Sequence, residues 1–139
     1  RGRYPEEFVH FAHGQAAVAR RFAREGNLCL IYEVKRGGGA GAIYAVGRVT
    51  RDQVVDDDAS GFEERPGRPS RYPHAVPFRV TTRLASRENG VPLTRLKRVL
   101  GRTHLRARGG LLTLTREQFE ELEQALLERA AAEVRSRLL

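Results

Sequence analysis

The sequence predicts an α+β fold in which a mixed or antiparallel sheet is flanked by helices. Two apolar runs, residues 28–34 and 42–49, follow each other with only a short segment rich in Arg and Gly between them. A third run, residues 76–84, alternates apolar and polar residues with the period of a strand. Other segments repeat apolar residues at steps of three and four, as amphipathic helices do. Successive strands without helices between them favour this fold over a doubly wound parallel sheet.

The N-terminal segment has helical spacing. Its apolar residues recur at steps of three and four over residues 4–25, with Pro5 near the start and Gly26 after the end. Gly14 interrupts the pattern, so we expect either one helix or two short helices that meet near residues 13–15.

The two apolar runs predict a β-hairpin, because the glycines between them supply the positive backbone angles that a turn needs. Arg48 stands alone among apolar neighbours near the end of the second run, and this position predicts that it is buried. Residues 52–70 contain three consecutive aspartates with several glycines and prolines, and they predict a long surface loop.

The C-terminal half continues with strands and helices. Residues 76–84 predict a strand whose wet face carries Pro77, Arg79, Thr81 and Arg83. Helical spacing predicts a short helix from Pro92 that ends at Gly101, and residues 111–114 predict another strand. The pattern Thr-Arg-Glu-Gln at 115–118 matches a capping box. It predicts the start of a long C-terminal helix whose inner face carries Phe119, Leu122, Leu126, Ala130, Val134 and Leu138.

Length and composition predict one domain over residues 1–139. Hydrophobic residues make up 40 % of the chain, and no apolar run is long enough to span a membrane. We therefore expect a bacterial, cytoplasmic protein without a membrane partner, whose first residue is a trimmed end or a domain border. The single cysteine, Cys29, excludes an internal disulfide and a multi-cysteine zinc site, and its apolar neighbours favour a structural thiol over a reactive one.

Positive charge is concentrated in one block of the chain. The formal net charge is +8, and residues 65–108 hold twelve Arg or Lys against one acid, Glu88, a balance of +11. The remaining 13 basic and 16 acidic residues sum to −3. The excess of Arg over Lys is also what a GC-rich genome produces, so the position of the charge is more informative than its amount. A basic block of this size predicts a polyanionic partner.

No motif in the chain predicts a catalytic or metal site. The glycines of residues 37–41 lack the Lys and Ser or Thr of a phosphate-binding loop. His10 and His13 would share one side of a helix, but no third metal ligand lies near them in the sequence. The aspartates at 56–58 lack the spacing of a calcium loop. We therefore expect a protein that is not an enzyme and has no cofactor.

Aromatic residues accompany the basic block. Tyr72 lies between Arg71 and His74, Arg79 follows Phe78, and Phe62 precedes the block. Aromatic faces and guanidinium groups together can hold an unpaired or flipped base and grip its backbone. The alternative is a soluble strand whose aromatic residues belong to the core. This alternative is favoured for Phe78, while both interpretations remain open for Tyr72.

The order of these motifs resembles EVE domains of the PUA-like superfamily, which includes YTH and ASCH relatives. The resemblance covers about residues 14–127. It rests on the hairpin Leu-Ile-Tyr-Glu-Val (30–34) with Ala-Ile-Tyr-Ala-Val-Gly-Arg-Val (42–49), the acidic loop, and Tyr-Pro before Val-Pro-Phe-Arg-Val (76–80). Pro-Leu-Thr-Arg-Leu-Lys from Pro92 and Leu-Thr-Leu-Thr-Arg-Glu-Gln-Phe up to Phe119 complete it.

The resemblance implies a PUA-like pseudo-barrel flanked by helices that binds DNA or RNA and reads a modified base in an aromatic pocket. The start of the first helix and the loop near Tyr72 would then surround this pocket, while Tyr32 and Tyr44 would line it or pack in the core. The implied nucleic-acid-binding residues are His13, Gln15, Tyr32, Arg48, Arg71, Tyr72, His74 and Arg79.

Two features of the sequence differ from the family pattern. EVE and YTH pockets usually employ tryptophan, which this chain lacks, so a Tyr or Phe would have to stack on the base. The apolar strand that usually precedes the first helix is not evident in the opening residues. A small-ligand sensor or a protein-interaction domain on the same fold remains the alternative, with a homodimer or fusion to a catalytic domain as further arrangements.

Overall fold

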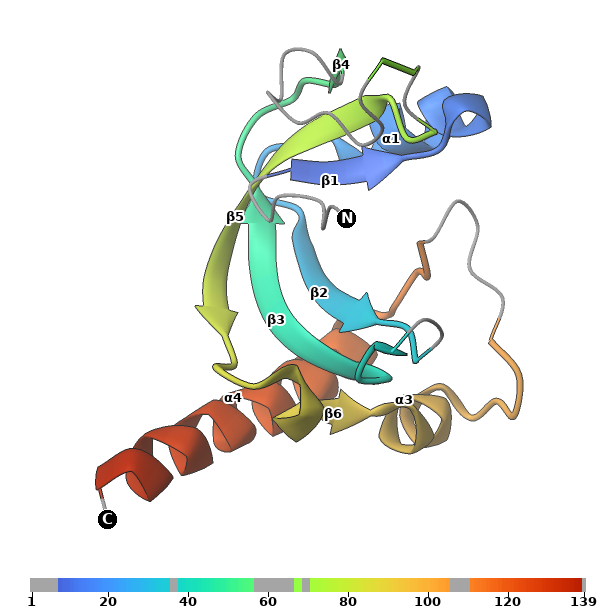
Figure 1. The fold of residues 1–139 in the computed structure, drawn as a ribbon. Helices are drawn as coiled ribbons and strands as arrows, with labels where there is room; N and C mark the ends of the chain where they lie inside the picture. Colours follow the sequence, from blue (N-terminus) through green and yellow to red (C-terminus); the bar gives the residue numbers. More distant parts are fainter. Residues whose placement is uncertain (1–7, 36–37, 57–66, 69–70, 106–110, 139) are drawn as a thin grey trace. The chain divides into compact units, whose positions relative to one another are not determined.

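The computed structural model describes residues 8–35, 38–56, 67–68, 71–105 and 111–138 and confirms the α+β class (Figure 1). In this part of the chain six strands form one sheet in the order β1-β5-β3-β2, with β4 paired to β5 and β6 paired to β3. The path ends at β1 and β2, so the sheet is open rather than closed into a barrel. Each register that involves β1, β4 or β6 is antiparallel. The sheet therefore has the predicted antiparallel character.

Two compact units divide the chain. The first unit comprises Arg1–Cys29, Arg48–Val80 and Arg108–Leu111, and the second comprises Leu30–Gly47, Thr81–Ala107 and Leu112–Leu139. The expectation of one domain over residues 1–139 stays a prediction.

The first unit begins with a strand where the sequence predicted a helix. β1 (Phe8–Phe11) pairs antiparallel with β5, with Phe8 opposite Pro77 and Phe11 opposite His74. The helical prediction holds only for η1 (His13–Gln15) and α1 (Ala16–Phe22). The step of three from Phe8 to Phe11 suits a helix, but pairing with a distant strand decides the outcome. The strand that seemed to be missing from the family pattern is thus present.

The predicted hairpin is confirmed as β2 (Leu28–Glu33) and β3 (Ala42–Val49). Gly38 and Gly41 adopt positive φ angles of 89° and 68°, as the turn prediction required. The prediction that Arg48 is buried is wrong, because it is the one exposed residue of β3. Successive strand residues point to opposite faces, so buried neighbours in the sequence do not bury Arg48 itself.

The strand predicted over residues 76–84 is β5 (His74–Arg83). Its second half alternates as expected, with Arg79, Thr81 and Arg83 exposed. The prediction of an exposed Pro77 is wrong, because this residue is buried and pairs with Phe8 of β1. The Thr50 N–H donates to its carbonyl oxygen at 3.2 Å. Part of the predicted long loop forms β4 (Val55–Asp56), which pairs with β5. Phe62 and the aspartates at 57 and 58 lie outside the described residues.

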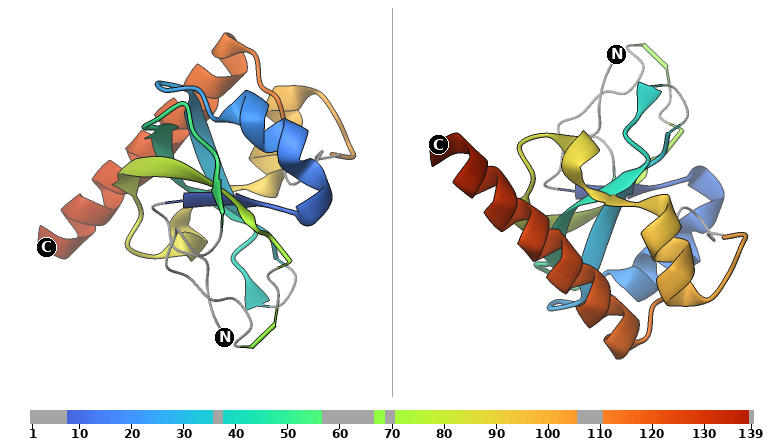
Figure 2. Two further views of the ribbon diagram at one scale, coloured as in Figure 1. Left: turned by 90° about the horizontal axis from the view of Figure 1, so that it is seen from above. Right: turned by 90° about the horizontal axis from the view of Figure 1, so that it is seen from below.

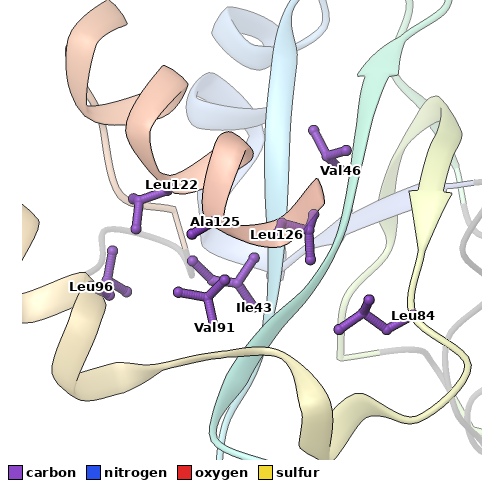
Figure 3. Packing of buried hydrophobic residues seen from close by; sticks show 8 residues of the cluster. All are labelled: Ile43, Val46, Leu84, Val91, Leu96, Leu122, Ala125 and Leu126. Carbon is purple, nitrogen blue, oxygen red and sulfur yellow. The ribbon is translucent and has the colours of Figure 1, made fainter. Parts of the chain in front are cut away.

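The second unit holds a hydrophobic core of buried residues (Figure 3). η3 (Arg87–Asn89) and β6 (Val91–Pro92) lead into α3 (Leu93–Leu100), which ends at Gly101 with a φ of 67°, as predicted. The core consists of Ile43, Val46, Leu84, Val91, Leu96, Leu122, Ala125 and Leu126. The prediction of a strand over residues 111–114 is wrong. Leu111 forms only an isolated bridge, and Leu114 packs against the core, so the apolar spacing there reflects packing.

α4 (Arg116–Leu138) confirms the predicted C-terminal helix. The Gln118 N–H donates to Thr115 Oγ1 at 3.1 Å, and the Thr115 N–H donates to Gln118 Oε1 at 2.9 Å. These reciprocal bonds are the predicted capping box. Leu122 and Leu126 are fully buried, whereas Val134 and Leu138, which the pattern placed on the inner face, are exposed. The buried leucines of α4 therefore lie in its first half, and Val134 and Leu138 in its second half are open to solvent.

Candidate nucleic-acid interface

Seven of the eight predicted binding residues belong to the first unit, and only Tyr32 belongs to the second. The seven come from three parts of the chain: η1, the last residues of β3, and β5 with the segment directly before it. They are His13, Gln15, Arg48, Arg71, Tyr72, His74 and Arg79.

A contact between two histidines brings the first and third of these parts together. His74 Nε2 lies 3.1 Å from the backbone carbonyl oxygen of His13, and the centroids of the two rings are 6.3 Å apart. Because a carbonyl oxygen only accepts hydrogen bonds, His74 must carry a proton on Nε2 to make this bond. The start of β5, directly after Tyr72, thus lies beside η1. This is the arrangement that the resemblance implied for the two segments.

The side chains around this contact are accessible from solvent. Arg71 is exposed and the Tyr72 side chain is 38 % exposed, although an aromatic ring of this kind is usually buried for the most part. Gln15 is partly buried, and its side chain does not cap α1. An exposed ring beside a guanidinium group can accept a stacked base and a phosphate at the same time.

Arg48 and Arg79 form a second exposed group. The bond from Thr50 to the Pro77 carbonyl oxygen sets the register of the two antiparallel strands here. Continued by two residues, this register places Arg48 opposite Arg79, on the same face of the sheet, and both are exposed. Like charges directly opposite each other are unfavourable in a sheet, and an anion between them would relieve the repulsion.

Tyr32 and Tyr44 pack in the second unit. Tyr32 is partly buried against the hydrophobic core, and burial raises the pKa of its hydroxyl. Tyr44 is only 5 % exposed. The structure therefore supports core packing for both residues, the alternative that the sequence left open.

One exposed arginine of the same strand was missing from the candidate residues. Arg83 follows Arg79 with the two-residue period of β5 and is exposed, although it belongs to the second unit. The alternation of exposed residues along β5 was the sequence signal that could have added Arg83 to the candidate binding residues.

The structure also gives information on metal binding and on the reactivity of Cys29. His10 lies in β1 and His13 in η1, so the two do not share a helix face, and no group of three potential metal ligands occurs among the described residues. Burial raises the pKa of the Cys29 thiol to about 12, as expected for a structural cysteine. None of the described helices combines the length and the apolar character needed to cross a bilayer.

Comparison with known protein families places the chain in one of them. The family model described as EVE domain matches residues 3–125, which is most of the chain. No curated protein matches the chain significantly.

Proposed function

Because the chain belongs to the EVE domain family, which is linked to nucleic-acid binding, we propose that it is a non-catalytic module that recognises a modified or flipped base in DNA or RNA. The observation that carries the proposal is the exposed ring of Tyr72, which follows Arg71 and stands two residues before His74, the residue that contacts His13 of η1. A base that leaves its stack needs a flat apolar surface and a nearby cation for its phosphate. Tyr72 and Arg71 supply these two groups in adjacent positions.

The backbone of the nucleic acid would be held by the arginine pair of the sheet. Arg48 and Arg79 project from the same face of neighbouring strands, and a phosphate between them would neutralise their mutual repulsion. Contacts of this kind position the backbone and carry no sequence information. In this proposal, base preference therefore depends on Tyr72 and Gln15, and general affinity depends on the arginines.

A binding role is favoured over a catalytic one by the chemistry of the candidate residues. They include histidines and arginines but no serine or cysteine that could act as a nucleophile. The only thiol of the chain, Cys29, is kept protonated by its raised pKa of about 12.

The test is a fluorescence-anisotropy titration with matched DNA and RNA oligonucleotides, unmodified or carrying one methylated or hydroxymethylated base. We expect one modified oligonucleotide to bind better than its parent. We also expect affinity to fall at least about tenfold between low and physiological salt, since several phosphates are neutralised. Absence of binding, or binding that ignores salt, would overturn the proposal. Salt-dependent binding that is equal for all bases would overturn base recognition and leave a general polyanion-binding domain.

Variants separate the two roles. Tyr72→Ala should abolish the preference for the modified base at a cost of about 1–3 kcal/mol, whereas Tyr72→Phe should retain it because the stacking face remains. Arg79→Ala should weaken binding to all oligonucleotides alike. Arg116→Ala, which removes the same charge from the exposed start of α4, is the matched control and should leave affinity nearly unchanged.

A further inference from the structure

The last turns of α4 carry a second apolar stripe on the side of the helix away from the core. Leu127, Ala131, Val134 and Leu138 recur at steps of four, three and four, which is a heptad spacing. At 100° per residue they lie opposite the buried Leu122. The exposed fractions are 39 % for Leu127, 50 % for Val134 and 80 % for Leu138. We call these four residues, 127, 131, 134 and 138, the outer stripe.

The helix that carries the outer stripe is anchored through its other side. Glu133 accepts hydrogen bonds from the N–H groups of Ala85 and Ser86, at 2.8 and 3.0 Å, and from Asn89 Nδ2 at 2.9 Å. Arg129 Nη1 donates to the Asn89 carbonyl oxygen at 3.1 Å. The exposure of the outer stripe therefore reflects an ordered helix that presents apolar side chains to solvent, and not a frayed end.

The outer stripe lies beyond the part of the chain that defines the family. The family match ends at residue 125, whereas α4 continues to Leu138. In Figure 2 these last turns extend past α3 and β6, on which the first turns of α4 pack. The large buried core residues of α4 end at Leu126, next to the end of the family match, and the outer stripe begins at Leu127.

We propose that the outer stripe is a self-association surface, on which the α4 helices of two copies of this chain pack antiparallel. In this arrangement Leu127 lies opposite Leu138 of the second copy, and Ala131 lies opposite Val134. The two-fold axis passes between residues 132 and 133, so each large apolar residue of the stripe meets an apolar partner. An interface in which the same patch serves both subunits is the commonest form of homodimer.

Charged residues beside the outer stripe favour a second copy of this chain as the partner and determine the relative direction of the two helices. Antiparallel packing brings Glu128 next to Arg135 of the second copy, and symmetry repeats this pair of opposite charges. Parallel packing would instead place Glu123 next to Glu128 of the second copy, again twice. Opposite charges attract in the antiparallel arrangement and like charges repel in the parallel one, so the charged residues favour antiparallel packing.

The size of the interface predicts a weak dimer. Three turns of helix from each copy bury less than the roughly 1,000 Å² that a stable interface needs. We expect a dissociation constant of about 10–100 µM, which corresponds to a transient complex. The proposal rests on α4 alone and does not depend on the proposed nucleic-acid binding.

Sedimentation equilibrium of the full chain, free of nucleic acid, from about 5 to 500 µM in 0.15 M salt tests the association. We expect a reversible monomer–dimer equilibrium whose dissociation constant rises at least tenfold in Val134→Glu. Ala132→Glu adds the same charge to an exposed position outside the stripe and should leave the constant unchanged. A monomer at every concentration, or a dimer that Val134→Glu does not weaken, would overturn the proposal; the first result would leave the stripe to a different protein.

Charge reversal tests the arrangement with little risk to the fold, because both positions are exposed. Glu128→Arg and Arg135→Glu should each weaken the dimer, since each places like charges together. The double variant should restore the affinity of the original chain. Failure of the double variant to recover would contradict the antiparallel register.

Disulfide formation tests direction independently. We expect a mixture of Leu127→Cys and Leu138→Cys proteins to form a disulfide between the two variants under mild oxidation, while each variant alone forms little. Disulfides within each single-variant sample would show parallel packing and overturn the proposed direction. The original chain, with only Cys29, gives the background.

Discussion

The guanidinium group of Arg87 lies over the ring of Tyr44, with its Cζ atom 3.9 Å from the ring centroid. The same guanidinium donates from Nη1 to Glu33 Oε2 at 2.7 Å, and Glu33 Oε1 accepts the Ala40 N–H at 2.9 Å. The side chains of Arg87 and Glu33 are only 17 % and 22 % exposed, so solvent screens their interaction incompletely. This cluster fixes the turn of the hairpin to η3 within the second unit.

Replacement of Arg87 should therefore destabilise the protein. Arg87→Ala removes the cation–π contact and leaves Glu33 without this cation in a partly buried site, at an expected cost of about 1–3 kcal/mol. Arg87→Lys keeps the charge but loses the planar guanidinium group with its several donors, so about half of this loss is expected. Urea unfolding followed by circular dichroism measures both values. Arg98→Ala, on the exposed side of α3, is the control and should change stability by less than about 0.5 kcal/mol.

Local signals in the sequence predicted most of the second unit. The turn glycines, the capping box at Thr115 and the stop at Gly101 each act over a few residues, and all three are confirmed. The strand β1 was missed because its sequence fits a helix equally well and its partner β5 is far away in the chain. Long-range pairing of this kind overrides local propensity and cannot be read from spacing.

Gly90 allows a second prediction, which concerns its close packing against the backbone of Ile43. A Cβ atom added there would collide with the carbonyl oxygen of Ile43 and lie 3.0 Å from the Ala42 Cβ, so the backbone itself would have to move. We expect Gly90→Ala to cost about 2 kcal/mol or more in the free energy of unfolding, since a backbone shift here disturbs the core. Gly14→Ala is the matched control, because nothing lies within 4 Å of an added Cβ and no positive φ is required. Equal stability of the two variants would contradict this packing.

The thiol of Cys29 should be inert in the native protein. Burial raises its pKa to about 12, so the reactive thiolate is scarce at pH 8. We expect labelling by a disulfide reagent at pH 8 to be at least about 100-fold slower than in urea, where the thiol has the pKa of about 8.5 of a free cysteine. Similar rates in the two conditions would show that the thiol is accessible and ionises in the folded state.

The sequence proposed the candidate residues, and the resemblance implied that η1 lies near the segment of Tyr72, but neither gave the contacts between individual residues. Composition and position pointed to Tyr72 and its basic neighbours, and the wet face of β5 pointed to Arg79. The contact of His13 with His74, and the register that places Arg48 opposite Arg79, depend on long-range pairing, which one sequence does not reveal. The same reason applies to Tyr32, because alternation along a strand defines two faces but does not show which face packs in the core.

Glu133 supplies the last prediction, on pH dependence. Burial alone would raise the pKa of this carboxyl, but the hydrogen bonds from Asn89, Ala85 and Ser86, together with Arg137, outweigh it and hold the pKa below its usual range. A carboxyl with a lowered pKa in the folded state stabilises that state when it is ionised. Its contribution is therefore complete above the ordinary Glu pKa of about 4.3 and is lost as the pH falls through the lowered native value.

Glu133→Gln should reproduce this loss at neutral pH. The amide accepts fewer hydrogen bonds and carries no charge, so we expect a cost of about 1–2 kcal/mol at pH 7. The difference from the original chain should shrink on acidification, because protonation brings the original carboxyl to the same neutral state. Urea unfolding at a series of pH values measures this difference. Glu121→Gln, at an exposed position of α4, should show a difference within about 0.5 kcal/mol at pH 7, and a constant cost for Glu133→Gln at all pH values would mean that ionisation plays no part.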